Sequence, residues 1–171
     1  MIELLTRNAL RFVFLIIFQV LILNNVQMGG FVNPYLYVLF ILMLPVETPG
    51  WMLLLLAFAI GLGVDLFENT AGMHASASVF MAFCRPYLLN MIAPREGFDR
   101  GTKLTIQKFG LAWFLTYAGI LILLHHLALF YLEIFRFSTF FSTLLRVFLS
   151  SVFTLGLIVI TQFLFNPVKK S

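Results

Sequence analysis

Few side chains in this sequence of 171 residues could hold a metal ion or act as a general acid and base, and most flank the ends of apolar runs. They are Asp65, Glu68, His74, His125, His126 and Glu133, with Arg136 and Arg146 nearby. Their spacing does not favour such chemistry, because there is no HExxH motif and adjacent histidines on a helix project about 100° apart. Neither a glycine-rich phosphate loop nor a GxSxG motif occurs. We therefore predict no catalytic residue, metal site or cofactor, and interpret these side chains as solvated groups at one membrane boundary.

Asp65 is the one member of this set whose position requires a further explanation. An apolar helix leads into Asp65 and Glu68, and the chain leaves it through a turn of small residues ending at Gly72. An acid near the C-terminal end of a helix opposes the helix dipole, and an acid next to a hydrophobic span is costly. We expect its partner to be a backbone N–H group of residues 69–72, His74, Arg146 or another protein.

The composition indicates an integral membrane protein. Hydrophobic residues make up 61% of the sequence and charged residues only 11%, well outside the usual range of soluble domains. The net charge of +4 comes from basic residues in the connections between apolar runs, which excludes a nucleic-acid-binding stripe. The single cysteine, Cys84, cannot form an intramolecular disulfide and is interpreted as a small buried hydrophobe.

Six apolar segments predict a single all-α transmembrane domain over residues 1–171, built as a bundle of six membrane-spanning helices. The segments cover residues 12–28, 31–46, 51–66, 75–92, 109–132 and 143–165. Helices are expected throughout, because a spanning chain must satisfy its own backbone polar groups. The second and third segments have about 16 residues where a straight span needs roughly 20, so they are either thin spans or a re-entrant pair.

The distribution of basic residues predicts that both termini are cytoplasmic. Six spans place eight basic residues inside and two outside; the eight are Arg7, Arg11, Arg95, Arg100, Lys103, Lys108, Lys169 and Lys170. The two outer ones are Arg136, spaced to pair with Glu133, and Arg146. The basic connection over residues 93–108 is expected to face anionic lipid of the inner leaflet, with docking of a cytoplasmic partner as the alternative.

Small and unusual residues inside the segments point to helix packing. Gly61 and Gly63 permit close helix approach, for which packing within the chain is favoured over a ligand role. Pro86 should kink its helix by freeing the carbonyl of Ala82. Arg85 is too deep for a loop residue, roughly 20 Å below Asp65, and either snorkels inward or donates to carbonyls freed at the kink.

The order of several of these residues resembles the rod shape-determining MreD family. The shared pattern is Asn33-Pro34-x-Leu36, a turn at Pro45, then Gly61-x-x-x-Asp65-Leu66 followed by Gly72. The resemblance is best over residues 33–89, and the chain length and six-segment layout agree along the whole sequence.

The resemblance implies a non-enzymatic component of the bacterial inner membrane that takes part in cell shape and peptidoglycan synthesis. Its implied partners are an MreC-like bitopic membrane protein, MreB, RodA, a class B penicillin-binding protein and the lipid bilayer. The family-like residues are Pro34, Gly61, Asp65 and Gly72; we expect helix packing with the partner through Gly61, Gly63, Ala75 and Ala77, with Asp65 as a polar anchor. The family is also similar in fold to substrate-binding subunits of energy-coupling-factor transporters, so the alternative function is binding of a small molecule in an outward cavity.

Overall fold

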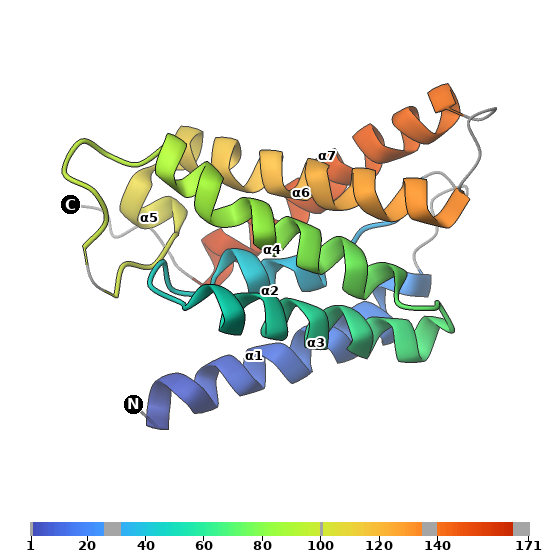
Figure 1. Ribbon diagram of the computed structural model, residues 1–171, viewed down its shortest axis with the longest axis horizontal. Coiled ribbons are helices and arrows are strands. Elements are labelled where there is room, and N and C mark those ends of the chain that lie inside the picture. Colours follow the sequence, from blue (N-terminus) through green and yellow to red (C-terminus); the bar gives the residue numbers. More distant parts are fainter. Residues whose placement is uncertain (1, 26–31, 100, 135–139, 166–171) are drawn as a thin grey trace.

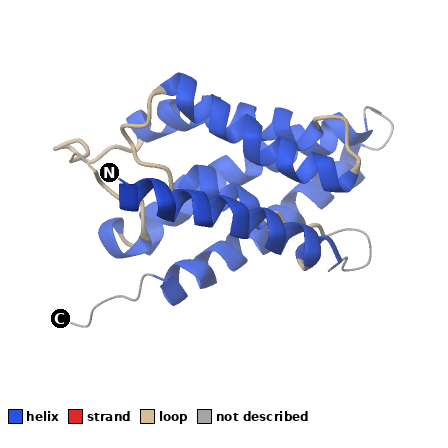
Figure 2. Ribbon diagram, turned by 90° about the horizontal axis from the view of Figure 1, so that it is seen from below, coloured by secondary structure: helices blue, strands red, loops and turns tan. Residues whose placement is uncertain are grey.

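Five long helices form most of the molecule in the computed structural model, which describes residues 2–25, 32–99, 101–134 and 140–165 (Figures 1 and 2). They are α1 (Ile2–Leu21), α3 (Gly50–Glu68), α4 (Met73–Met91), α6 (Leu111–Ile134) and α7 (Phe140–Phe165). Helix α3 packs against α4, α4 against α6, and α6 against α7, while α1 packs against α3. The all-helical prediction is thus confirmed for the described part of the chain.

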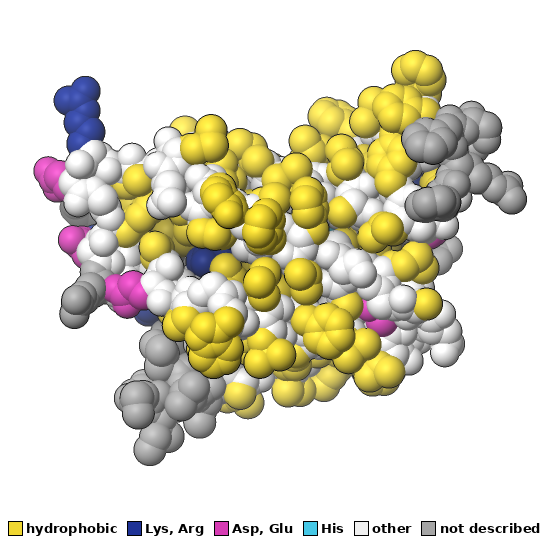
Figure 3. All heavy atoms as spheres, in the orientation of Figure 1, with side chains coloured by type: hydrophobic (Ala, Val, Ile, Leu, Met, Phe, Trp, Pro, Cys, Tyr) yellow, Lys and Arg dark blue, Asp and Glu magenta, His cyan; other side chains and the backbone are white. Residues whose placement is uncertain are grey.

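Four of these helices are long and apolar enough to cross a membrane, which indicates a multi-pass membrane protein. The candidate spans are Asn8–Asn25, Gly50–Glu68, Leu111–Ile134 and Phe140–Phe165. Apolar side chains cover much of the face in Figure 3, and the charged side chains visible there gather mainly at one end. The helix α4 is as long as α3 but more polar, because it includes His74 and Arg85.

The prediction of a continuous helix over residues 31–46 is wrong. From residue 32, where the described part of this segment begins, its helical residues are limited to the 3-10 turn η2 (Leu36–Val38) and the single turn α2 (Leu39–Leu42). This broken segment runs through the middle of the bundle, and Tyr37 and Ile41 are completely buried (Figure 1). The following segment, predicted over residues 51–66 as a thin span or half of a re-entrant pair, is the 19-residue helix α3, which runs the length of the bundle.

Side chains of other helices satisfy the backbone at the start of the broken segment. Gln19 of α1 is fully buried, donates to the carbonyl of Pro34 over 2.9 Å, and accepts from the N–H of Leu36 over 2.8 Å. The N–H of Tyr35 donates to Thr154 Oγ1 of α7 over 3.1 Å. Non-helical backbone at membrane depth is tolerated where protein groups replace the missing helical bonds, as these do.

Arg85 performs the same task at the end of the broken segment. Its side chain is buried, donates to the carbonyl of Leu44, and donates through Nε to Tyr117 Oη over 2.8 Å. Tyr117 in turn donates to the carbonyl of Leu42 over 3.0 Å. Snorkelling is therefore wrong for Arg85, and the carbonyl to which it donates, that of Leu44, belongs to the broken segment rather than to a kink at Pro86.

The start of α1 and the end of α7 lie at the same end of the bundle as the connection between α4 and α5 (Ile106–Phe109) (Figures 1 and 2). We call this the terminal end, and the opposite end, which carries the turn between α3 and α4, the turn end. Four of the basic residues from which the cytoplasmic termini are predicted lie outside the described residues: Arg100, Arg136, Lys169 and Lys170.

Candidate functional site

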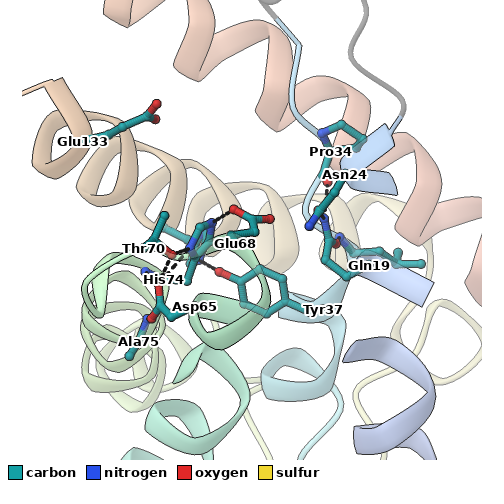
Figure 4. Close-up of polar contacts among 12 residues, drawn as sticks. Gln19, Asn24, Pro34, Tyr37, Asp65, Glu68, Thr70, His74, Ala75 and Glu133 are labelled. Atoms are coloured by element: carbon teal, nitrogen blue, oxygen red, sulfur yellow. Dashed lines mark hydrogen bonds and ion pairs between the residues drawn. The ribbon is translucent and has the colours of Figure 1, made fainter. Parts of the chain in front are cut away.

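The carboxylate of Asp65 caps the N-terminus of α4 at the turn end (Figure 4). Its Oδ1 accepts from the N–H of His74 over 3.0 Å and from the Thr70 hydroxyl, and its Oδ2 accepts from the N–H of Ala75 over 2.9 Å. His74 and Ala75 are the second and third residues of α4, whose N–H groups have no acceptor inside the helix. The acid that opposes the dipole of its own helix therefore lies at the positive end of the next helix.

A tight turn and one glycine place α3 and α4 close enough for this contact. Asn69 ends α3 with a φ of 54°, and Gly72 precedes α4 with a φ of 80°, both in the left-handed region. A Cβ atom on Gly61 would lie 2.5 Å from the Cα of Ala75, so only glycine permits this approach of the two backbones. Asp65 is 2% exposed as a result.

His74 links two carboxylates at this turn. Its Nδ1 lies 3.0 Å from Asp65 Oδ1, and its Nε2 lies 3.2 Å from Glu68 Oε2. Among the partners expected for Asp65, His74 is confirmed and the backbone donors lie just past the predicted turn. Arg146 instead pairs with Glu133 over 3.2 Å.

The prediction that the histidines are solvated at the boundary is wrong, because His125 and His126 are fully buried. His125 Nε2 lies 2.7 Å from the hydroxyl of Tyr37, and His126 Nε2 lies 3.2 Å from Thr154 Oγ1. Their helix α6 packs against both α4 and α7, so this face of α6 is turned into the bundle. Within the described residues, no three His, Cys, Asp or Glu side chains are placed to hold one metal ion.

The small residues predicted to pack against a partner are covered within the chain. A Cβ on Gly63 would lie 2.6 Å from Ile16 Cδ1 of α1, and Ala75 and Ala77 are buried. Pro34 is also buried, where its carbonyl accepts from Gln19. The contacts that the structure shows for these residues are those of internal packing.

Several of the polar groups that complete this interior were not predicted from the sequence. Gln19, Tyr37 and Tyr117 were not singled out, although each makes a buried hydrogen bond between segments far apart in the chain. Gln19 offered a signal, since it is the one polar side chain in the apolar run over residues 12–23 and an amide there is costly without a partner. Cys84, the predicted buried hydrophobe, is half-buried with a free thiol.

The hollows on the described molecule include a groove and a cavity. A groove of about 520 Å³ lies between α3 and α4 and is lined by Leu54, Phe58, Ser76, Val79, Phe80 and Phe83. A cavity of about 260 Å³ lies near the turn end and is lined by Leu23, Asn24, Asn33, Pro34, Tyr35 and Glu68. We call these the α3–α4 groove and the polar cavity.

Comparisons with protein-family models, curated proteins and solved structures found no match.

Proposed function

We propose that the protein is a non-catalytic scaffold of the bacterial inner membrane that binds the transmembrane helix of an MreC-like bitopic protein. In this proposal both termini are cytoplasmic, and the protein acts in the elongation machinery with MreB, RodA and a class B penicillin-binding protein. The pattern of Pro34, Gly61, Asp65 and Gly72 supports the family, and the α3–α4 groove supplies a surface for the partner helix.

The shape of the α3–α4 groove is the observation that carries this proposal. Its lining residues repeat at helical spacing, with Leu54 and Phe58 on α3 and Ser76, Phe80 and Phe83 on α4. Residues at such spacing form rows along the two helices, and a third helix can pack its own side chains between these rows. Phe58, Phe80 and Phe83 are 47%, 41% and 54% exposed, so a partner would cover apolar rings rather than compete with internal contacts.

Filling the groove provides the test. The hydroxyl of Ser76 is exposed and donates to the carbonyl of Gly72, four residues earlier. Thr116 on α6 is a matched control, since it is also exposed and donates to the carbonyl of Ala112. Ser76→Trp should reduce the amount of co-purified MreC-like protein by roughly five- to 160-fold, as an overpacking cost of about 1–3 kcal/mol implies, while Thr116→Trp should not.

Two results would count against the proposal. Equal recovery of the MreC-like protein with Ser76→Trp and Thr116→Trp would remove the groove as its binding surface. Failure of the unmodified protein to co-purify with it from membranes would remove the scaffold function itself.

The alternative function, a small-molecule-binding subunit, predicts a large pocket opening outward. The polar cavity lies at the predicted outer end, but about 260 Å³ is below the roughly 300–1,000 Å³ of pockets for drug-sized ligands. The size of this cavity therefore favours the scaffold over the transporter subunit.

A further inference from the structure

We propose that Gly61, Asp65 and Gly72 act as one unit that fixes the spacing of α3 and α4 and thereby shapes the α3–α4 groove for a partner helix. None of the three lines the groove. They are therefore positioning residues of the groove and not contacts of the partner. This inference rests on the proposed function, because it concerns the same groove and the same MreC-like partner.

Gly61 sets how closely the two helices approach beside the groove. It follows the lining residue Phe58 by three positions, and Ala75, which it faces, directly precedes the lining residue Ser76. A Cβ on Gly61 would lie 2.5 Å from the Cα and 2.6 Å from the N of Ala75, and 2.6 Å from the carbonyl oxygen of His74. These are backbone atoms, which cannot rotate away as the end of a side chain can. Any larger residue at position 61 must therefore push α4 away as a whole.

Asp65 and Gly72 hold the start of α4 in this position (Figure 4). The carboxylate of Asp65 accepts from the N–H of His74 over 3.0 Å and from that of Ala75 over 2.9 Å, which joins the end of α3 to the start of α4. Gly72 has a φ of 80° and turns the chain directly before α4. Its carbonyl accepts from the backbone N–H of Ser76 over 2.9 Å and from the Ser76 hydroxyl over 2.7 Å. A lining residue of the groove is thus bonded to the turn itself.

The spacing of the two helices decides how well a third helix fits between them. Helices in lipid gain no hydrophobic drive from associating and depend on van der Waals packing. A gap of about 0.5–1 Å in such a contact loses roughly a quarter to a half of its dispersion energy. A displaced α4 moves its row of lining residues relative to the row on α3, so a partner helix no longer packs closely on both rows.

The experiment measures how much MreC-like protein co-purifies with the full chain from membranes, per amount of folded chain, for two matched pairs of variants. Gly61→Ala is compared with Gly63→Ala, whose Cβ meets only the side chain of Ile16 on α1. Gly72→Ala is compared with Gly97→Ala, because Gly97 also has a positive φ, 76°, but lies in the connection at the terminal end. We expect Gly61→Ala and Gly72→Ala to reduce recovery roughly fivefold or more, and each control to change it by less than about twofold.

A double-mutant cycle separates a change in the groove from a general loss of stability. Phe80→Ala removes one ring from the lining. Because Gly61→Ala already displaces α4, the further effect of Phe80→Ala should be smaller in that background by about twofold or more. In the Gly63→Ala background the two reductions should simply multiply. They should also multiply with Ile158→Val, which shortens a fully buried side chain of α7 outside the groove and lowers stability alone.

The outcomes distinguish this inference from the scaffold function on which it rests. Equal recovery within either glycine pair overturns the inference but leaves the groove as the binding surface, and so do reductions that multiply in the Gly61→Ala background. Failure of the unmodified chain to co-purify with the MreC-like protein overturns the scaffold function and this inference with it. If Gly61→Ala does not fold, as circular dichroism would show, the comparison of Gly72→Ala with Gly97→Ala decides by the same criterion.

Discussion

Replacing Asp65 with alanine should destabilise the protein by about 2–6 kcal/mol. The substitution leaves the N–H groups of His74 and Ala75 without an acceptor in a buried site, and each buried unsatisfied donor costs about 1–3 kcal/mol. Asp65→Asn keeps one oxygen and can still accept from one of the two N–H groups, so its loss should be about half as large. The expected order of stability is therefore Asp65, then asparagine, then alanine.

The free energy of unfolding can be measured in detergent micelles by titration with a denaturing detergent, followed by circular dichroism. Asp99→Ala is the matched control, because Asp99 has an 85% exposed side chain and a 3.5 Å ion pair with Lys108, and such surface pairs contribute about 0–1 kcal/mol. Amide hydrogen exchange gives a local measure. The amides of His74 and Ala75 should exchange faster in Asp65→Ala, while those in the middle of α6 should change less.

One pattern of results would refute this reasoning. If Asp65→Ala changed the free energy of unfolding no more than Asp99→Ala does, the carboxylate would not be the cap of α4. If that variant also lost an MreC-like partner at unchanged stability, Asp65 would be the polar anchor for a partner that the family resemblance first suggested.

Two further predictions concern internal contacts and use the same unfolding measurement. Gly61→Ala should lower the free energy of unfolding by about 1–3 kcal/mol, because the added Cβ meets the backbone of Ala75. Gly63→Ala should lower it less, because its Cβ meets only the end of the Ile16 side chain. Equal losses would contradict the close approach of α3 and α4. Gln19→Leu should lower the free energy of unfolding by about 2–6 kcal/mol, because it leaves the Pro34 carbonyl and the Leu36 N–H unpaired. The control Gln107→Leu, at an exposed position, should change it by less than about 0.5 kcal/mol. A similar effect of both variants would show that Gln19 does not hold the broken segment.

The long helices could be predicted from the sequence because length and apolar content are local properties. Residues 51–66, 109–132 and 143–165 correspond to α3, α6 and α7 to within a few residues at each end. The broken segment could not be distinguished from a continuous helix, because a buried apolar run has the same sequence pattern in either structure. The side chains that bind its backbone are far away in the sequence. Gln19 is 17 residues from Leu36, and Thr154 is 119 residues from Tyr35.

The candidate site could be predicted in part. An acid near the C-terminal end of a helix opposes the helix dipole, so a partner was expected for Asp65, and His74, nine residues later, was a candidate. That the same carboxylate caps α4 depends on the antiparallel approach at Gly61, which the spacing alone does not fix. The burial of His125 and His126 was missed because their helix is apolar on nearly all sides, so its pattern does not show which face is turned inward.

The break in the segment over residues 32–46 links the fold to the polar cavity. A continuous helix would satisfy its own backbone, whereas this segment needs Gln19, Thr154, Tyr117 and Arg85 to satisfy it. The non-helical start of the segment, residues 33–35, is also part of the cavity wall facing Glu68. The buried polar side chains that support the break therefore also hold this wall in place, and irregular backbone within a membrane bundle is most readily understood where it lines such a cavity. The break in the helix and the polar cavity next to Glu68 therefore have the same structural origin.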